Sequence, residues 1–185
     1  MSYVPDILAF DYILAFCYIV ILSLVFYAYQ RKKSQNDPNY KYFMKAFYIK
    51  IAGGLGFMFL TVYYWGGGDT YSYYNTGRDL LTYILEDPTE RFKLFFSSVE
   101  NMNWYKYKFA YNRHDFLKSS ANFATVKITA ITNMVSFQSY IASTVIYSVI
   151  SFLGVWNMYY VFCKIYPHLR KQLFYGFFFI PSVIL

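Results

Sequence analysis

Long apolar runs alternate with short polar stretches along the chain, and this pattern predicts membrane-spanning helices. The first run covers about residues 10–29 (FDYILAFCYIVILSLVFYAY), the second about residues 46–65, and the third lies within residues 140–163. About 20 apolar residues suffice for a helix to cross a hydrocarbon core of about 30 Å. All three runs are therefore expected to be transmembrane helices.

A fourth apolar stretch, LFYGFFFIPSVIL, begins at Leu173. Its length is too small for a straight helix to cross the bilayer, so it predicts only the start of a fourth span. We therefore expect the chain to be a fragment, or a shortened form, of a larger polytopic protein. The expected fold class is all-α: a polytopic helical membrane protein with about four transmembrane segments.

The region of residues 66–133 is more polar and separates the second and third runs. In the stretch DPTERFKLFFSS, Asp87, Pro88 and Glu90 form a helix start with an N-cap, a proline in the first turn and a capping box. This helix either lies on the membrane surface or packs on its own domain. The stretch SSANFATVKITAITNMVSF predicts a second surface helix that leads into the third span.

These patterns divide the chain into three parts. Residues 1–65 hold the first two transmembrane helices with a basic cytoplasmic loop at 30–45. Residues 66–133 form a long exterior loop that carries amphipathic helices. Residues 134–185 hold the third transmembrane helix, a basic loop and the start of a fourth helix.

Composition supports lipid as the solvent of this chain. It is 57% hydrophobic, 25% aromatic and 15% charged, whereas a soluble domain carries about 25% charged residues. The formal net charge is +7, but the basic residues gather in two short stretches between apolar runs. This distribution is typical of membrane topology and argues against a nucleic-acid partner. The two stretches contain Arg31, Lys32, Lys33, Lys41 and Lys45, and then Lys164, Arg170 and Lys171.

The positive-inside rule places both basic stretches in the cytoplasm. The N-terminal residues include Asp6 and Asp11 and no basic residue, so the N-terminus is expected outside. Residues 66–133 nearly balance their basic and acidic side chains, which suits an exterior loop. One topology agrees with the charge of all four segments: the N-terminus outside, the first loop inside, the long loop outside and the last loop inside.

The sequence contains no pattern for nucleotide or metal chemistry. Cys17 and Cys163 both lie in apolar segments without a partner at metal-ligand spacing, so small buried hydrophobes are expected there. No Walker loop, GxGxxG, HExxH or CxxC occurs. A nucleotide-driven enzyme is therefore disfavoured, no metal site is predicted, and no cofactor is identified.

The candidate site lies in YYWGGGDTYSYYNTGRDL, residues 63–80, where the second apolar run ends. Asp69 follows three glycines, and Tyr71, Tyr74 and Arg78 follow within a few residues. Aromatic faces, a carboxylate and a guanidinium together are typical of a carbohydrate or phosphate site, and a carboxylate can act as a general base. The alternative is a glycine helix stop followed by an interfacial aromatic belt, although such a belt needs no acid.

An acidic residue in the first large exterior loop, near the membrane face, resembles the GT-C glycosyltransferase superfamily. The run ATVKITAITNMVSFQSYIASTVIYSVISFLGVWNMYYVFCKIYPHLRKQLFYGFFFIPSVIL is similar to the family layout of a basic residue entering a helix, a span, a short basic loop and a helix near proline-serine. The layout also resembles bacterial exopolysaccharide and O-antigen polymerase-like proteins. The similarity covers roughly residues 60–185.

The resemblance implies a transferase or polymerase that uses an undecaprenyl-phosphate-linked glycan at the outer face of a bacterial inner membrane. It implies Asp69 as the base for the acceptor hydroxyl and Tyr74 as part of the same site. Arg78 or Lys127 would face the donor phosphate. The family commonly pairs the aspartate with a neighbouring glutamate, whereas Thr70 stands here, so no metal or double-acid role is assigned.

A second hypothesis needs no catalysis. Gly53, Gly54 and Gly56 give the second span a small-residue face, and such faces let helices pack closely. The chain would then be an integral subunit of a larger membrane complex, with lipid and other membrane proteins as its partners. A transporter is disfavoured because the middles of the spans are nearly bare of charge.

Overall fold

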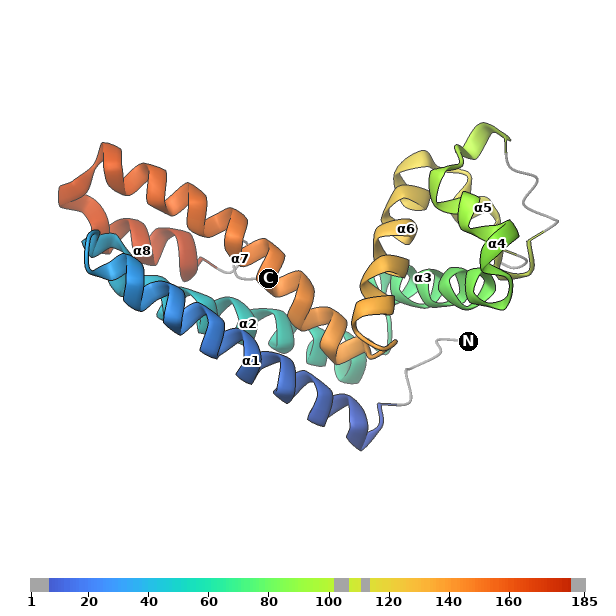
Figure 1. Cartoon of the computed structure of the whole chain (residues 1–185), viewed down its shortest axis with the longest axis horizontal. Coiled ribbons are helices and arrows are strands. Elements are labelled where there is room, and N and C mark those ends of the chain that lie inside the picture. Colours follow the sequence, from blue (N-terminus) through green and yellow to red (C-terminus); the bar gives the residue numbers. More distant parts are fainter. Residues whose placement is uncertain (1–6, 102–106, 111–113, 181–185) are drawn as a thin grey trace.

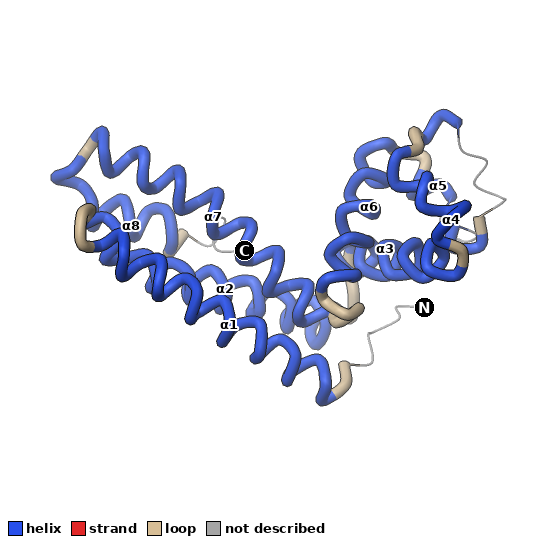
Figure 2. The backbone as a smooth tube through the Cα atoms, in the orientation of Figure 1, coloured by secondary structure: helices blue, strands red, loops and turns tan. Residues whose placement is uncertain are grey.

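The computed structural model describes residues 7–101, 107–110 and 114–180, and these residues form helices joined by short turns without any strand. Two parts meet at an elbow: a long bundle of helices and a shorter helical limb at one end of it (Figures 1 and 2). We call them the spanning bundle and the outer limb. The all-α expectation is confirmed for the described part of the chain.

The spanning bundle contains three segments that are long and apolar enough to cross a membrane. They coincide with the three apolar runs of the sequence, which confirms three candidate spans and supports a membrane protein. The first is helix α1 (Ala9–Ser34) and the third is α7 (Tyr140–Ile165). The second, Pro38–Tyr64, consists of the 3₁₀ turn Pro38–Tyr42, helix α2 (Phe43–Phe59) and the π-helical turn Leu60–Tyr64.

The fourth expected span is not confirmed. After the 3₁₀ turn Pro167–Leu169, helix α8 (Arg170–Phe178) has nine residues and packs against α7 and α2. A helix of this length rises only about 14 Å, less than half of a hydrocarbon core. The remaining part of the predicted fourth segment, residues 181–185, lies outside the described residues.

Aromatic side chains form the core of the spanning bundle. The ring of Phe43 lies 4.8 Å from that of Trp156 and 5.0 Å from that of Phe152, in edge-on arrangements that favour aromatic pairs. Helix α1 adds partly buried side chains to this core, such as Phe26, whose ring lies 5.2 Å from that of Phe47, but Ala15 is its one buried residue among those described. Most of the apolar surface of α1 is therefore left for lipid or for further helices.

The outer limb is built on α3 (Asp69–Glu86) and α6 (Ser120–Val135), which pack along each other and enclose a second hydrophobic core. Gly77 permits this approach, because a Cβ there would lie 2.8 Å from the Cβ of Thr129. Shorter elements complete the limb: α4 (Pro88–Arg91), α5 (His114–Leu117), and the 3₁₀ turns Phe92–Phe96, Val99–Asn101 and Lys108–Ala110.

Two expectations for residues 66–133 need correction. The stretch after the glycines was expected to be a polar loop, yet it forms α3, a helix of 18 residues. The stretch DPTERFKLFFSS was expected to open one helix, either on the membrane surface or packed on its own domain, yet it forms a single α-helical turn followed by a 3₁₀ turn. Its N-cap is as predicted: the Asp87 carboxylate accepts a hydrogen bond from the backbone N–H of Glu90 at 3.4 Å. The second predicted helix is present as α6.

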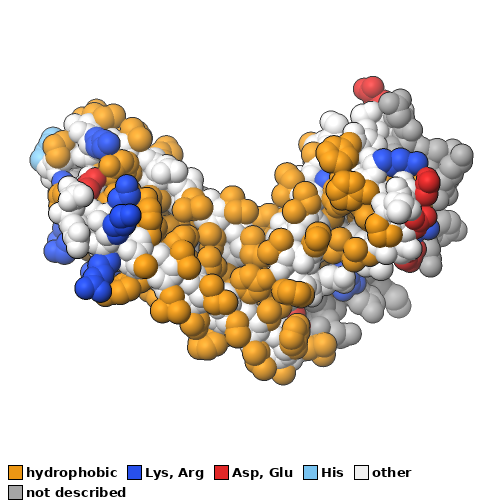
Figure 3. All heavy atoms as spheres, in the orientation of Figure 1, with side chains coloured by type: hydrophobic (Ala, Val, Ile, Leu, Met, Phe, Trp, Pro, Cys, Tyr) orange, Lys and Arg blue, Asp and Glu red, His pale blue; other side chains and the backbone are white. Residues whose placement is uncertain are grey.

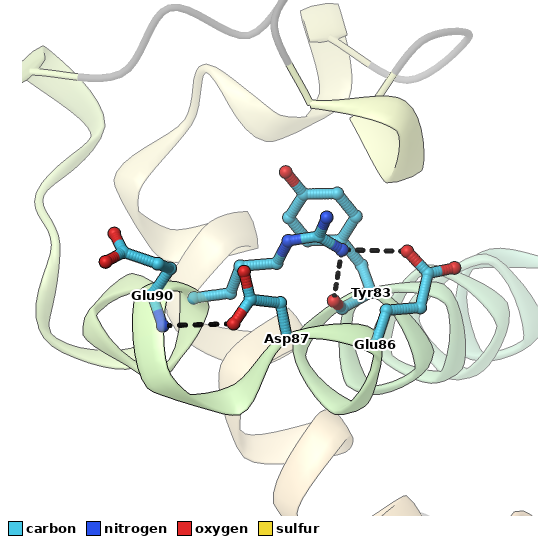
Figure 4. A network of polar contacts seen from close by, with 5 residues as sticks. Tyr83, Glu86, Asp87 and Glu90 are labelled. Atoms are coloured by element: carbon cyan, nitrogen blue, oxygen red, sulfur yellow. Dashed lines mark hydrogen bonds and ion pairs between the residues drawn. The ribbon is translucent and has the colours of Figure 1, made fainter.

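An arginine joins α4 to the end of α3. The Nη1 of Arg91 donates to the backbone carbonyl of Tyr83 at 2.9 Å and to the carboxylate of Glu86 at 2.7 Å. Its guanidinium also lies over the Tyr83 ring, 4.0 Å from the ring centroid (Figure 4). Since guanidinium groups combine hydrogen bonds with stacking on aromatic rings, this contact fixes the far end of the limb.

Charge is distributed unevenly along the molecule. The two basic stretches of the sequence meet at the end of the spanning bundle that lies away from the outer limb, where α1 and α7 end and α2 and α8 begin. Figure 3 shows Lys and Arg side chains gathered at this end, and both Lys or Arg and Asp or Glu on the outer limb. On the face that Figure 3 shows, the coloured side chains of the spanning bundle between these two ends are mainly hydrophobic.

Candidate functional site

The three glycines form the turn that places Asp69. Gly66, Gly67 and Gly68 have φ values of 65°, 136° and 152°, which side chains rarely adopt. The N–H of Gly67 donates to the carbonyl of Thr61 at 3.0 Å, so the turn folds back on the second span. Asp69 is then the first residue of α3, with its side chain exposed. The positive end of the helix dipole favours a carboxylate at this position.

Asp69 lies at the edge of a groove of about 400 Å³ in the elbow between the two parts. Three helices line this groove, which we call the Asp69 groove. The lining combines one carboxylate with hydroxyl groups and aromatic rings, a mixture that can bind a polyhydroxylated ligand. The lining residues are Asp69, Thr70, Tyr73 and Tyr74 from α3, Thr125, Ile128 and Thr129 from α6, and Tyr140, Ser143, Thr144 and Tyr147 from α7.

Tyr71 and Arg78 face a different groove, of about 300 Å³, on another side of α3. Asp11 of α1 also lines it, and we call it the Arg78 groove. The Arg78 guanidinium lies 5.9 Å from the ring centroid of Tyr74. Tyr74 and Tyr140 line both grooves, and their rings pack with centroids 4.8 Å apart at a tilt of 58°, so they form the wall between the two grooves.

Lys127 lines neither groove. Its ammonium donates to the backbone carbonyl of Ser97 at 3.0 Å and lies 4.5 Å from the centroid of the Phe123 ring. These contacts hold it on the outer limb. The predicted site residues therefore do not meet in one cavity: Asp69 and Tyr74 share one groove, Tyr71, Tyr74 and Arg78 share the other, and Lys127 lies apart.

A polar cluster that sequence reasoning missed holds the elbow together. The side chain of Asn133 is fully buried, its Nδ2 donates to the carbonyl of Tyr74 at 3.1 Å, and its Oδ1 accepts from Ser143 at 3.2 Å. The Tyr74 hydroxyl donates to the carbonyl of Gln138. Phe137 and Gln138 both adopt left-handed backbone angles, with φ of 51° and 59°. A signal was present in the stretch TNMVSFQSYIAST, where polar residues recur across the end of α6, the turn and the start of α7.

Burial of Tyr74 also limits its chemistry. Loss of solvent raises the pKa of the Tyr74 hydroxyl to about 12, although the nearby Arg78 charge opposes this shift. At neutral pH the hydroxyl therefore stays protonated and acts as a donor. Of the groups that line the Asp69 groove, Asp69 is the one with the chemistry of a base.

A further hollow of about 310 Å³ lies between α2 and α7 within the spanning bundle. It shares Thr70, Tyr140, Thr144 and Tyr147 with the Asp69 groove, so the two are adjacent. Lys50 lines this hollow and is only 3% exposed. A buried lysine side chain thus lies inside the candidate span Pro38–Tyr64.

Metal binding finds no support in the described part of the chain, where no three His, Cys, Asp or Glu side chains could hold an ion together. His114 and Asp115 have side chains outside the description. Comparison with protein-family models, curated proteins and solved structures gives no match. The function is therefore argued from the site alone.

Proposed function

We propose that the chain belongs to a membrane glycosyltransferase or polysaccharide polymerase that acts on a lipid-phosphate-linked sugar, with Asp69 as the general base. The observation that carries the proposal is the position of Asp69. An exposed carboxylate lies on the first turn of a helix, at the edge of a hydroxyl- and aromatic-lined groove, just beyond the end of a candidate span.

The proposed reaction is a displacement at the anomeric carbon of the donor sugar. The acceptor hydroxyl oxygen forms a bond to that carbon, its proton passes to the Asp69 carboxylate, and the bond from the carbon to the phosphate oxygen breaks. The lipid phosphate leaves with the bonding electrons. A positioned base of this kind contributes about 10²–10⁴-fold to a rate.

The neighbouring Arg78 groove supplies a charge for phosphate. Arg78 is half-buried beside Tyr74, and guanidinium groups bind phosphate oxygens through paired N–H donors. The wall of Tyr74 and Tyr140 separates this group from Asp69. In the proposal the reacting sugar lies in the Asp69 groove, and Arg78 offers a separate phosphate site on the other side of the wall.

Orientation is part of the proposal. The basic end of the spanning bundle faces the cytoplasm under the positive-inside rule, so the N-terminus and the outer limb lie outside a bacterial inner membrane. The substrate class is then an undecaprenyl-phosphate-linked glycan in the outer leaflet. The basic end and the outer limb lie at opposite ends of the same helices, which supports this arrangement.

The test is Asp69→Asn in membranes that carry the complete assembly, with transfer from a radiolabelled polyprenyl-linked sugar as the readout. We expect a loss of about 10²–10⁴-fold in rate, partial recovery with Asp69→Glu, and unchanged protein abundance. Glu90→Gln is the matched control, because Glu90 is an exposed acid at the far end of the limb. Wild-type transfer by Asp69→Asn would refute the proposal.

A second candidate is a non-catalytic integral subunit, and the surface of α1 favours it. The helix has 26 residues and buries only Ala15 fully among those described, so it presents a long apolar face to other membrane helices. Cysteine crosslinking from Cys17, which is exposed on this helix, distinguishes the two candidates. A stoichiometric crosslinked partner, together with unimpaired glycan transfer by Asp69→Asn, would establish the subunit role.

A further inference from the structure

The surface of α6 that faces away from α3 is apolar. Four of its residues are more than half exposed although their side chains are large and hydrophobic. Ile128, Ile131 and Val135 recur at intervals of three and four residues, so they share one face of the helix. The four residues are Ile128, Ile131, Met134 and Val135.

This face carries no charge. Lys127 is the one charged residue of Ser120–Val135, and its ammonium is bound to the Ser97 carbonyl within the limb. Two ion pairs among the described residues of the limb lie elsewhere, between Arg91 and Glu86 and between Lys93 and Glu90. A contiguous, uncharged apolar face of this kind marks an interaction site, and its position beside a candidate span suits contact with a membrane.

The α6 face is continuous with the surface of a candidate span. The hydroxyl of Tyr147 on α7 donates to the Thr129 hydroxyl on α6 at 3.1 Å, which joins the two helices at the elbow. From Tyr147 the exposed apolar side chains continue along α7 through Ile150 and Met158. Figure 3 shows a broad hollow between the spanning bundle and the limb, with hydrophobic side chains on both of its sides.

We infer that the α6 face is immersed in the leaflet at the non-basic end of the bundle, so that the Asp69 groove opens sideways into lipid. Its occupant is then lipid, and its ligand is an amphiphile that enters from the membrane with its polar head at Asp69. The chain of the ligand lies on Ile128 and Tyr147, which line the groove and are exposed. The ligand assignment rests on the proposed function, whereas the immersion of α6 does not.

Site-directed spin labelling in lipid nanodiscs tests the immersion. Single cysteines replace Ile128 or Ile131 in a Cys17→Ala background, and Cys163 is left in place because it is buried. Labelled Cys17 itself, exposed on the first span, is the reference inside the membrane, and Thr82→Cys on an exposed site of α3 is the aqueous reference. We expect labels at 128 and 131 to collide with oxygen rather than with a water-soluble nickel chelate, at a depth of about 5–10 Å.

Nickel accessibility at 128 and 131 equal to that at 82 would overturn the inference. Shielding from both oxygen and nickel would show a protein partner on this face, and would overturn it as well. These measurements need no substrate. If α6 is immersed but Asp69→Asn still transfers sugar at the wild-type rate, the immersion of α6 stands and the proposed reaction is refuted.

The ligand is tested with a chain-deuterated polyprenyl phosphate in the same nanodiscs. Deuterium modulation of the spin echo at the Ile128 label, absent at the Thr82 label, is the expected result. An equal amount of chain-deuterated phosphatidylcholine is the control for bulk lipid. Modulation of the same depth from both lipids would show no preference for the polyprenyl chain and would overturn the ligand assignment.

Discussion

The hydroxyl of Tyr74 on α3 donates a hydrogen bond to the backbone carbonyl of Gln138, 64 residues later in the chain. The acceptor lies in the turn between α6 and α7, where two consecutive residues adopt left-handed backbone angles. Asn133 binds the backbone of Tyr74 from the other side. The elbow is therefore fixed by side chain to backbone hydrogen bonds around one tyrosine.

Removal of this hydroxyl should weaken the elbow. Tyr74→Phe leaves the Gln138 carbonyl without its donor, and the loss of such a bond costs about 1–2 kcal/mol. Thermal unfolding in detergent micelles measures the change. Tyr64→Phe is the control, because Tyr64 is 79% exposed and its hydroxyl should contribute little. Equal stability of the two variants would contradict the role of Tyr74.

The same hydroxyl should make the protein less stable at high pH. Burial raises the pKa of Tyr74 from 10.0 to about 12, so the folded state favours the protonated form. The contribution of this shift to the free energy of unfolding is fully present below pH 10. It falls by roughly 2–3 kcal/mol as the pH rises to 12. The difference in unfolding free energy between wild type and Tyr74→Phe, followed from pH 8 upward, isolates this group from the other tyrosines. A difference that stays constant to pH 12 would show that Tyr74 titrates normally.

Gly77 should be intolerant of any side chain. A Cβ at this position lies 2.8 Å from Thr129 Cβ and 3.0 Å from the backbone nitrogen of Ala130, so α6 would have to move. Gly77→Ala should therefore destabilise the protein by about 1–3 kcal/mol. Gly154→Ala on α7 is the control, since no neighbouring atom lies within 4 Å of its Cβ and alanine is the better helix former. Chemical denaturation of both variants should give opposite signs.

Arg91 should stabilise only the far end of the limb. Arg91→Lys keeps the charge but loses the planar group that stacks on Tyr83 and bonds to its carbonyl. Hydrogen exchange followed by mass spectrometry should show faster exchange in residues 83–91 and no change in α2 or α7. Lys93→Ala is the control, because its pair with Glu90 is largely exposed and contributes little. Faster exchange throughout the spanning bundle would show that the limb is not a separate unit.

The spans were predictable because bilayer thickness dictates the length of an apolar run. The basic end was predictable because Lys and Arg gather in the loops on one side of a membrane. The N-cap at Asp87 was predictable because its signal is local. Helix α3 was missed because its residues include Asn75, Thr76 and Gly77, which are poor helix formers. It is stabilised instead by packing of Leu80 and Leu81 against α6, which no local pattern reveals.

The site was predictable only in part for the same reason. Asp69 and Arg78 are neighbours in sequence, but a helix turns about 100° per residue, and nine residues place them on opposite sides of α3. With α3 taken as a loop, both could be assigned to one site. The contact of Lys127 with Ser97, 30 residues apart, depends on tertiary packing and could not be read from spacing.

The outer limb is joined to the spanning bundle by two chain crossings, the glycine turn before Asp69 and the left-handed turn after α6. Between these crossings, hydrogen bonds from Tyr147 to Thr129 and from Ser143 to Asn133 tie α7 to the limb. The walls of the Asp69 groove come from both parts, so the same bonds set the width of the groove. The glycine run is thus one of two covalent connections that shape the groove, as well as the turn that places Asp69.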